Sequence, residues 1–445
     1  ELRHIEQRVA AIAMSGTRGG DGDSIFLDLA KDSFTDLSNN SNIALNGIPM
    51  AEANDTVVPL LMHANVSYSN GVIVVTASET IDVTPASLVD LTKWHLQNIS
   101  GTDMISLQGA LIRQVDDPYT LQMVINMTEH QRVTSIAASG SKGGDGTPAI
   151  LSVAANSLQD IATNKLAAPV QLTFFEVDDT VIPHVVSATI DYSTGVMVMI
   201  TSETIDVSPT SLVDLSKVFL VDSTGDRTVA LSTSASVYQT RAHNAVNLLG
   251  ATSINATDDP YLLAVRVYLT EVQRISALVL SDKPGGNTGQ VKLDVLAGAV
   301  RDIAGNLNVD NLDLVVTEAS DVIKPTFVSA TLNYSSGVLV VTASETIDAT
   351  AASLVVLNKF TLVDTLVTGN NVPLDGNMPN YKAWKDASLA YAQTSTATVA
   401  ESEGLFFTVT LTEVQRVAAL FISGETGGDG AAVKLSIAVD GIKDM

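Results

Sequence analysis

The sequence predicts an all-β protein made of tandem antiparallel β-sandwich modules, each with a short helical corner. Three observations support this fold class. Several motifs recur at domain-sized intervals along the 445 residues. Between the motifs lie short β-branched, apolar runs separated by turn residues, as in β-sandwiches. One segment in each repeat changes to a helical period, whereas the long alternating helices of an α/β protein are absent.

Three polar motifs define the repeat. Ser-Glu-Thr-Ile-Asp occurs at 78–82, 202–206 and 344–348, and Thr-Glu-x-Gln-Arg occurs at 128–132, 270–274 and 412–416, with a shortened copy at 6–9. A glycine cluster follows each copy of the second motif, at 19–22, 143–146, 285–287 and 427–430. Tandem copies of one domain-sized unit indicate a string of modules rather than a single catalytic domain.

The spacing of the motifs locates an insertion. Glu129 to Glu203 and Glu271 to Glu345 are both 74 residues apart. Within a module, Glu79 to Glu129 is 50 residues, whereas the corresponding spacing in each of the next two modules is 68. An 18-residue insertion in one place, beside constant spacing elsewhere, indicates a loop on a fixed scaffold.

Recurring Asp- and Pro-containing segments predict the module boundaries. Asn-Asp-Thr-Val-Val-Pro at 54–59 matches the segments at 178–183 and 320–325, each between two strand-like runs. We therefore expect the C-terminal half of a module at 1–56, a complete module at 57–180, a module with the insertion at 181–322, and a module with the insertion but without its last strand at 323–445. Junctions this short, with a proline that restricts the backbone, leave little room for a flexible linker.

The elements of one module follow in order along residues 57–180. Apolar, β-branched runs predict strands, and Ser-Asn-Gly at 69–71 predicts a hairpin turn because glycine permits a positive φ. Thr128 followed by Gln131 is a capping-box pattern, so a helix of one or two turns should begin there. The expected strands lie at 60–68, 72–76, 88–91, 94–97, 105–111, 121–126, 149–154 and 170–174.

The order of these motifs resembles that of tandem immunoglobulin-like repeats, of the bacterial Ig-like and cadherin-like kind, in very large extracellular surface proteins. Such proteins include bacterial adhesins and large extracellular proteins of marine microbes and algae. The resemblance rests on Asp-Thr-Val-x-Pro, Tyr-Ser-x-Gly-Val, Ser-Glu-Thr-Ile-Asp, Leu-Thr-Glu-x-Gln-Arg and Asp-Ile-Ala-Gly-Asn, and covers essentially the whole chain. It implies an immunoglobulin-like sandwich, an extracellular or cell-surface location, and work in extension, adhesion or assembly into surface fibres.

Composition restricts the possible partners. The formal net charge is −25, from 49 acidic against 24 basic residues, which opposes electrostatic binding to nucleic acid or to an anionic membrane. The chain contains no cysteine, which excludes disulfides and thiolate metal sites. No apolar run approaches the length of a membrane span, so we expect no direct membrane insertion by this segment.

The repeated acidic residues suggest two roles. The Glu and Asp of Ser-Glu-Thr-Ile-Asp are interpreted mainly as strand-end turn residues that accept backbone N–H groups, with cation binding as the alternative. The junction acids are the better candidates for calcium, the one optional cofactor that we expect, because oxygen-only ligands suit it. Such an inter-module calcium site would stiffen the string and would involve Asp55, Asp178, Asp179 and Asp321.

No motif indicates an enzyme. The sequence has neither a phosphate-binding glycine loop followed by Lys-Ser/Thr, nor His-Glu-x-x-His, nor Gly-x-Ser-x-Gly, so we expect no catalytic activity and no required cofactor. Seven Asn-x-Ser/Thr triplets are candidate glycosylation sites if the protein is secreted by a eukaryote. They begin at Asn39, Asn54, Asn65, Asn98, Asn126, Asn255 and Asn333.

Taken together, these features predict an extracellular structural protein, a segment of a long tandem-repeat chain that forms a surface filament, appendage or layer. The expected partners are copies of itself, other fibre subunits or glycans, and the inserted loops at about 232–257 and 374–403 are the expected contact points. Two alternatives remain: an adhesin stalk with a ligand-binding head elsewhere, and an accessory region of a large secreted enzyme.

Overall fold

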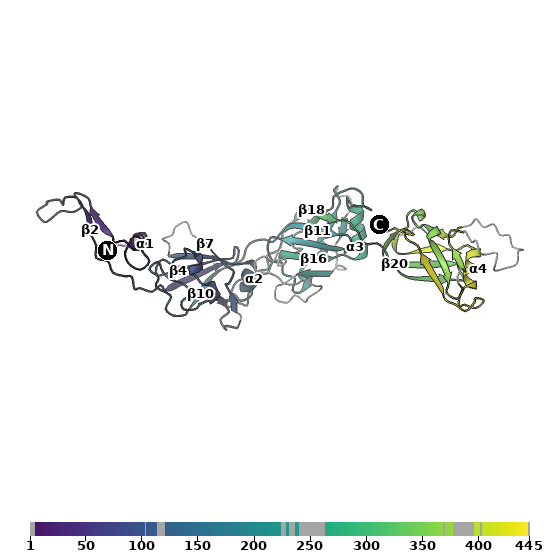
Figure 1. Cartoon of the computed structure of the whole chain (residues 1–445), viewed down its shortest axis with the longest axis horizontal. Helices are drawn as coiled ribbons and strands as arrows, with labels where there is room; N and C mark the ends of the chain where they lie inside the picture. The colour runs from purple at the N-terminus through teal and green to yellow at the C-terminus, as the bar shows by residue number, and fades with distance from the viewer. Residues whose placement is uncertain are drawn as a thin grey trace.

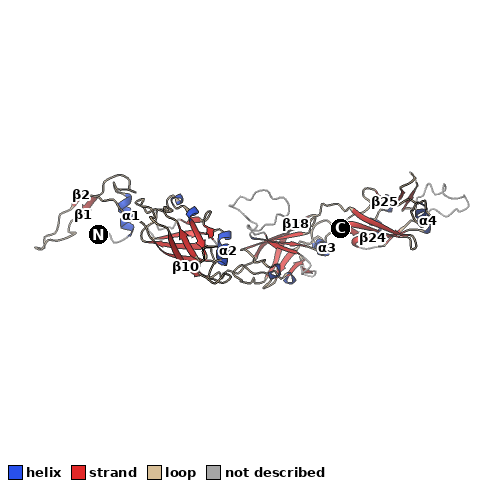
Figure 2. Ribbon diagram, turned by 90° about the horizontal axis from the view of Figure 1, so that it is seen from below, coloured by secondary structure: helices blue, strands red, loops and turns tan. Residues whose placement is uncertain are grey.

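The computed structural model is a row of three β-sandwiches preceded by a helix and a hairpin (Figure 1). It describes residues 5–102, 104–113, 121–223, 228–230, 236–239, 263–367, 370–376, 396–400 and 403–443. Strands dominate every sandwich, and each helix is short, as the view in Figure 2 shows. The predicted all-β class with a short helical corner in each module is therefore confirmed.

The first complete sandwich has the strand order of an immunoglobulin-like fold. One sheet contains β7-β8-β4-β3 and the other contains β6-β5-β9, and β10 joins them. The first half of β10 pairs antiparallel with β9, and its second half pairs parallel with β3. The first, second, fifth and sixth strands form one sheet, and the third, fourth and seventh form the other. When β6 is counted as an extra edge strand beside β5, this division matches the two sheets of an immunoglobulin domain. The strands are β3 (Leu61–Ser67), β4 (Val72–Ala77), β5 (Trp94–Gln97), β6 (Met104–Ser106), β7 (Leu111–Arg113), β8 (Gln122–Asn126), β9 (Ile150–Val153) and β10 (Val170–Val177).

The second sandwich repeats this topology strand for strand. Its order is β14-β13-β17-β18-β11-β12-β16-β15, and β18 again pairs parallel with the first strand, β11. The strands are β11 (Val185–Asp191), β12 (Val196–Thr201), β13 (Val218–Val221), β14 (Thr228–Ala230), β15 (Ser236–Gln239), β16 (Ala264–Tyr268), β17 (Lys292–Val295) and β18 (Asn311–Ala319).

The described part of the third sandwich has no strand in the position of β10 and β18. Its sheets are β19-β20-β24-β23 and β22-β21-β25. Consequently β19 is mostly exposed along its length, whereas the equivalent β3 and β11 alternate with buried residues. The strands are β19 (Phe327–Asn333), β20 (Val338–Asp348), β21 (Phe360–Asp364), β22 (Asn371–Pro373), β23 (Thr398–Val399), β24 (Glu403–Thr410) and β25 (Val433–Ile437).

Each sandwich places one α-helix after its third hairpin, and the predicted capping box is present. The Thr128 hydroxyl accepts a hydrogen bond from the Gln131 backbone, while the Gln131 side chain accepts one from the Thr128 N–H, so two otherwise unpaired N–H groups are satisfied. The helices are α1 (Ile5–Ala13), α2 (Glu129–Ala137), α3 (Glu271–Leu280) and α4 (Glu413–Phe421). Figures 1 and 2 place α2 and α3 at the end of their sandwich that faces the next one.

Shorter elements complete the modules. The N-terminal segment adds a hairpin of β1 (Phe26–Leu29) and β2 (Leu45–Pro49). Single 3₁₀ turns precede the third strand of each sandwich, at Ala86–Leu88 and Leu91–Lys93, at Thr210–Leu212 and Leu215–Lys217, and at Ala352–Leu354 and Leu357–Lys359. Asp90 and Asp214 begin the second of these turns by accepting a backbone hydrogen bond, which is the capping role that short acidic side chains fill well.

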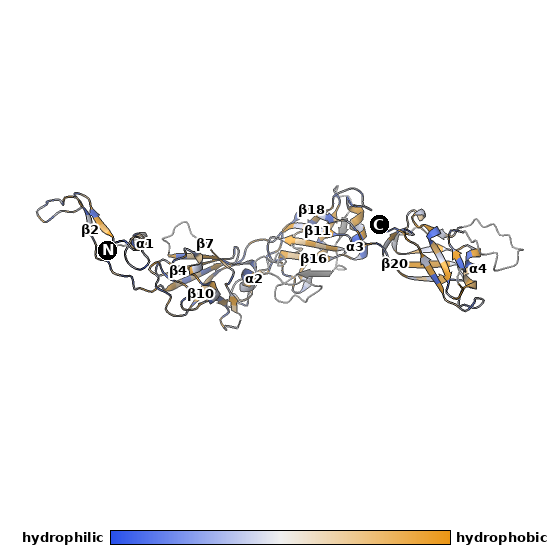
Figure 3. Cartoon of the chain, in the orientation of Figure 1, coloured by the Kyte–Doolittle hydropathy of each residue, from blue (hydrophilic) through white to orange (hydrophobic). Residues whose placement is uncertain are grey.

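Each sandwich has its own apolar core. Hydrophobic residues concentrate on the strands (Figure 3), and buried clusters centre on Trp94, on Tyr192 and on Phe360. Alternate residues of β4 and β12 are buried, as expected for strands with one face on a core. The buried residues of each cluster come from one module, but Ile303 of the second sandwich also packs against the first core. The contacts between modules therefore combine this apolar contact with polar side chains at the sandwich ends.

Candidate functional site: the junctions between modules

The repeated motifs meet at the junctions between modules. Helix α2 of the first sandwich lies against the Ser-Glu-Thr-Ile-Asp segment of the second, which begins where β12 ends. The connecting segment between β10 and β11 contributes Asp179, which is only 2% exposed. Three elements far apart in sequence therefore form one polar contact.

Arg132 is the centre of this contact. Its guanidinium forms a two-bonded pair with Glu129 at 2.7 and 2.8 Å and donates to the Tyr68 carbonyl at 3.0 Å. It also donates to Asp179 in the connecting segment, and to Glu203 of the next module at 3.2 Å. The planar, five-donor guanidinium suits such a convergence of carboxylates and carbonyls. One side chain thus ties together its own module, the connection and the following module.

Glu129 completes the contact from the same helix. Its Oε1 accepts hydrogen bonds from the backbone N–H and the hydroxyl of Thr204, at 3.0 and 2.9 Å. Burial alone would raise the pKa of Glu129, but the hydrogen bonds and the charge of Arg132 outweigh burial and lower the pKa. The carboxylate is therefore ionised when it bridges the two modules.

The third junction, between the second and third sandwiches, repeats the arrangement seen around Arg132. Arg274 pairs with Glu271 at 2.8 Å, with Asp321 at 2.5 Å and, more distantly, with Glu345 at 3.7 Å. The Thr346 N–H donates to Glu271 at 2.9 Å. The repetition shows that the geometry belongs to the motif and not to one pair of modules.

The last copy provides an internal comparison. Arg416 forms the same pair with Glu413 and the same bond to a tyrosine carbonyl, that of Tyr334. No further module follows it in this sequence, and its side chain is 26% exposed, against 7% for both Arg132 and Arg274. The helix and its arginine are therefore organised within one module, and the next module adds the burial.

The glycine clusters after α1 and α2 also contact the following module. A Cβ on Gly143 would lie 2.4 Å from the Ile303 carbonyl oxygen and 2.9 Å from the Ala304 Cα, and a Cβ on Gly19 would meet Ile161 and Ala162 in the same way. At Gly427, in the last copy, nothing lies within 4 Å of the same position. The loop is therefore glycine-rich where two backbones approach closely, as well as where positive φ is needed.

Side chains reinforce this loop contact. Lys142 donates to the Asn306 side-chain oxygen at 3.1 Å, and the Asn306 amide donates to the Asp179 carbonyl at 3.1 Å. In the first junction, Asn164 donates likewise to the Asp55 carbonyl at 3.2 Å. The Asp-Ile-Ala-x-Asn loop of each following module therefore holds the connecting segment that precedes it.

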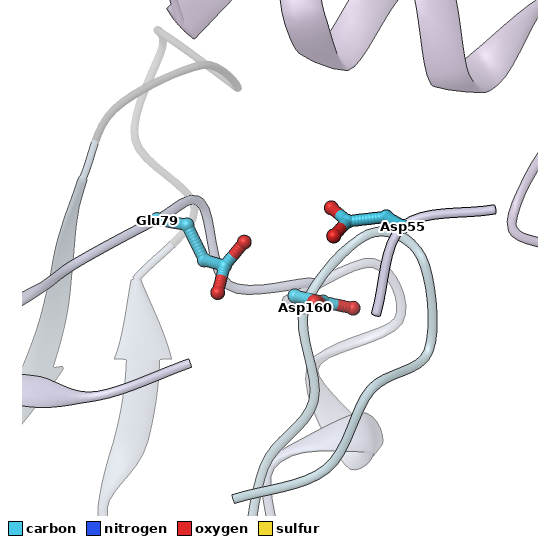
Figure 4. Close-up of side chains that lie close together, drawn as sticks. All are labelled: Asp55, Glu79 and Asp160. Carbon is cyan, nitrogen blue, oxygen red and sulfur yellow. The ribbon is translucent and has the colours of Figure 1, made fainter. Parts of the chain in front are cut away.

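Two clusters of three acids lie at these junctions. Asp55, Glu79 and Asp160 form the first, and Asp179, Glu203 and Asp302 form the second; in each, one oxygen per residue lies within 4.8 Å of the others. Figure 4 shows the first cluster, with the Glu79 and Asp55 carboxylates facing one another across Asp160. Except for Asp55, which is half-buried, these acids are 8% exposed or less.

Burial and mutual repulsion dominate the electrostatics of the clusters. Burial, with the charges of Asp160 and Asp55, raises the pKa of Glu79 to about 7. Burial also raises the pKa of Glu203 to about 7; Arg132 opposes the shift, and Asp179 and Asp302 add to it. Asp160 and Asp302 have raised pKa values for the same first reason. In both clusters the acids outnumber the arginine beside them.

The four acids predicted to bind calcium at the junctions have different partners in the structure. Asp55 and Asp179 each lie in a cluster, and Asp321 pairs with Arg274. Asp178 instead accepts a hydrogen bond from the Lys142 backbone at 3.3 Å, within its own module. Asp160 and Asp302 were not among the predicted residues, although their place in a recurring Asp-Ile-Ala-x-Asn segment was the available signal.

The aspartate and the glutamate of the Ser-Glu-Thr-Ile-Asp motif have different structural roles. Its aspartates behave as predicted: Asp82, Asp206 and Asp348 each accept a backbone N–H two residues later, at 3.0 to 3.1 Å. The turn interpretation was wrong for the glutamates, because Glu79 and Glu203 extend into the junction clusters. The spacing of Glu129 and Arg132 is compatible with a surface pair on the helix or with an interface contact, and the structure shows the interface contact, because Arg132 is buried against Glu203 of the next module.

The remaining predicted residues occupy varied environments. Of the glycosylation candidates, Asn39, Asn54, Asn65 and Asn333 are exposed, Asn126 is half-buried, Asn98 is 7% exposed, and Asn255 lies outside the described residues. Most of the inserted loops, 240–262 and 377–395, also lie outside them. Among the helices in the described ranges, none is long and apolar enough to cross a lipid bilayer.

Comparisons with known proteins add little beyond the fold. No family model matches the chain, and no curated protein matches it. Among solved structures, the titin domains Z1Z2 in complex with telethonin cover 60% of this chain and 99% of their own at 10% identity, with a TM-score of 0.15. A marsupial T cell receptor covers 80% and 93% at 10% identity, with a TM-score of 0.13. Both are immunoglobulin-like, but at these scores the strand order described above, not the likeness, defines the fold.

Proposed function

We propose that this chain is a segment of an extracellular structural protein, in which immunoglobulin-like modules are locked end to end into a stiff surface filament, appendage or layer. The observation that carries the proposal is the buried contact of Arg132 with Glu129, Asp179 and Glu203. The most often repeated residues of the chain therefore hold neighbouring modules in a fixed relative position. Modules that worked independently would not require these residues to be repeated.

The contact of Arg132 with Glu129, Asp179 and Glu203, here called the arginine lock, resists bending because its charges are buried. Arg132 and Glu203 are both almost fully buried, so separating the modules would have to rehydrate some charges and leave others without partners. Breaking a buried ion pair by removing one partner costs about 3–5 kcal/mol. A hinge motion of even a few ångströms at this point would lose several charge-assisted hydrogen bonds together.

The end-to-end lock is tested by replacing the arginine. We expect Arg132→Ala to make the chain bend at the first complete junction, seen as a shorter maximum dimension and broader shape distribution in small-angle X-ray scattering and negative-stain electron microscopy. Arg416→Ala is the matched control, because it loses the same intramodule bonds without a following module. If Arg132→Ala leaves the shape of the chain unchanged while circular dichroism shows folded modules, the lock does not exist.

Assembly is tested separately from stiffness. The filament proposal expects lateral or end-on association of the wild-type chain as its concentration rises, visible by electron microscopy. Chains that remain straight but monomeric at high concentration would argue for a stalk, in which the rod only carries another domain. Specific binding on a glycan array would favour the same stalk function.

A further inference from the structure

The two acidic clusters contain a feature that hydrogen bonding leaves unexplained. Among the described residues, Glu79 Oε1 and Glu203 Oε1 are fully buried and have no hydrogen-bond partner. Leaving such an acceptor unpaired costs about 1–3 kcal/mol, more when the group is charged. Each of these oxygens belongs to a carboxylate whose neighbours are two further carboxylates, so no donor from the cluster itself can satisfy it while all three are ionised.

The first cluster also has space for a small ion. A cavity of about 30 Å³ borders Asp55, Glu79 and Asp160, with Arg8 and Thr80 on its wall. That volume holds one or two particles of the size of water, for which about 10–15 Å³ each suffices. The cavity is therefore large enough for a single ion with a water ligand and too small for an organic ligand.

We propose that each cluster binds one divalent cation of the calcium type, coordinated by the connecting-segment aspartate, the Ser-Glu-Thr-Ile-Asp glutamate and the aspartate of the following module's Asp-Ile-Ala-x-Asn loop. The ligand sets are Asp55, Glu79 and Asp160 at the first junction, and Asp179, Glu203 and Asp302 at the second. This deepens the proposed structural function, because the ion would fix the connecting segment to the module that follows it.

The donor set favours calcium over other divalent metals. All ligands are carboxylate oxygens, without histidine or cysteine, which excludes the preferred environment of zinc. Calcium takes about six to eight oxygen ligands in a flexible geometry, whereas magnesium demands a near-ideal octahedron and keeps several of its waters. Three carboxylates converging from separate segments, with backbone carbonyls and water completing the shell, therefore suit calcium better.

Local hydrogen bonds prepare the aspartates for this role. Asp160 accepts from the Asn164 N–H at 2.7 Å and from its amide at 2.9 Å, and Asp302 is held in the same way by Asn306. Asp55 accepts from the Val57 N–H through one oxygen. Each carboxylate keeps at least one lone pair for an ion, and its orientation is fixed before binding.

The two sites should differ in strength because their arginines differ. Arg132 already contacts Asp179 and Glu203, whereas Arg8 is exposed and acts on Glu79 only through space. A cation that competes with a guanidinium for the same oxygens binds more weakly. We therefore expect the Asp55–Glu79–Asp160 site to have the higher affinity.

The test is titration of the chelator-treated full chain with CaCl₂ at pH 7.5 by isothermal titration calorimetry. We expect at least two binding events. Glu79→Gln, which preserves shape, should remove the tighter one, and Asp302→Asn should remove the weaker one. Asp36→Asn is the control, because Asp36 holds Asn40 in the equivalent loop motif of the first repeat but is exposed and lies in neither cluster.

Circular dichroism establishes that each variant is folded. Absence of calcium binding by the wild-type chain at millimolar concentration would overturn the proposal, and so would Glu79→Gln binding as many ions as the wild type. Small-angle scattering in the presence of chelator then distinguishes failure of the calcium proposal from failure of the proposed structural function. If the chain binds no calcium but stays straight in chelator, the metal proposal is wrong and the arginine contact still accounts for the stiffness.

Discussion

At the scale of single residues, one buried arginine at each junction between two sandwiches determines how neighbouring modules are joined. Arg132 and Arg274 occupy equivalent positions and contact the connecting aspartate and the next module's glutamate. The exposed copy, Arg416, shows that the side chain is already positioned before a neighbour is added. Preorganisation of this kind lowers the entropy cost of forming the junction.

The ionisation of Glu271 predicts acid sensitivity of the third junction, between the second and third sandwiches. Burial would raise its pKa, but hydrogen bonds from Arg274 and Thr346 dominate and lower the pKa to about 2. A depressed folded-state pKa contributes stability above the unfolded value near 4.5, and this stability is lost as pH falls toward 2. We expect scattering to show increased bending between these modules as pH decreases from about 4.5 to 2.

The control for this effect is Glu271→Gln, which cannot titrate. It should bend at neutral pH and gain little further bending in acid, because the contribution of the carboxylate is already absent. A variant that remains as straight as the wild type at pH 7 would show that Glu271 does not hold the junction.

At the scale of elements, sequence patterns predicted the helix cap and the strands, which depend on residues near in sequence. They did not predict the contacts between residues of different modules. The capping box at Thr128 and Gln131 and the β-branched run at β4 are set by neighbours in sequence, and both were predicted. The Glu129–Thr204 contact joins residues 75 apart, for which no periodicity exists. The constant 74-residue spacing from Glu129 to Glu203 was the available signal, since it spans the junction while spacing within modules varies.

The glycine loop predicts a substitution with a matched control. Gly143→Ala and Gly427→Ala both place a side chain at positive φ, +89° and +97°, and each should cost about 1–2 kcal/mol within its own module. Only Gly143→Ala would also push a Cβ against the next module's backbone at Ile303 and Ala304. We expect it alone to change the angle or flexibility of the junction, as measured by scattering.

Equal effects of the two alanines on chain shape would contradict the docking role of the loop. Thermal unfolding of both variants separates the shared backbone strain from the contact specific to the junction, because the strain lowers the melting temperature in either module.

At the scale of the whole molecule, separate cores and shared junctions imply a rod whose modules unfold with partial coupling. The buried residues of each apolar cluster come from one sandwich, so each core can unfold with its own transition, although Ile303 of the second sandwich packs against the first core. The junction contacts then add stability to a module only while its neighbour is folded. The tandem order of similar sandwiches was predictable from motif repetition, whereas the strength of this coupling required the buried geometry.

A double-mutant cycle measures that coupling. Arg132→Ala and Glu203→Gln should each destabilise the chain, and the double variant should be less destabilised than the sum, with an interaction energy of about 1–3 kcal/mol. The measurement is calorimetric unfolding of the full chain. Strict additivity would show that the two buried groups do not interact across the junction.

The junction is made from unlike surfaces: the helix and glycine loop at one end of a module meet the acidic motif and the Asp-Ile-Ala-x-Asn loop at the other end of the next. A head-to-tail interface of this kind cannot be inverted and does not close on itself as a symmetric pair does. The rod consequently has polarity. Rods aligned in parallel would present one chemistry at one face of an array and a different chemistry at the opposite face.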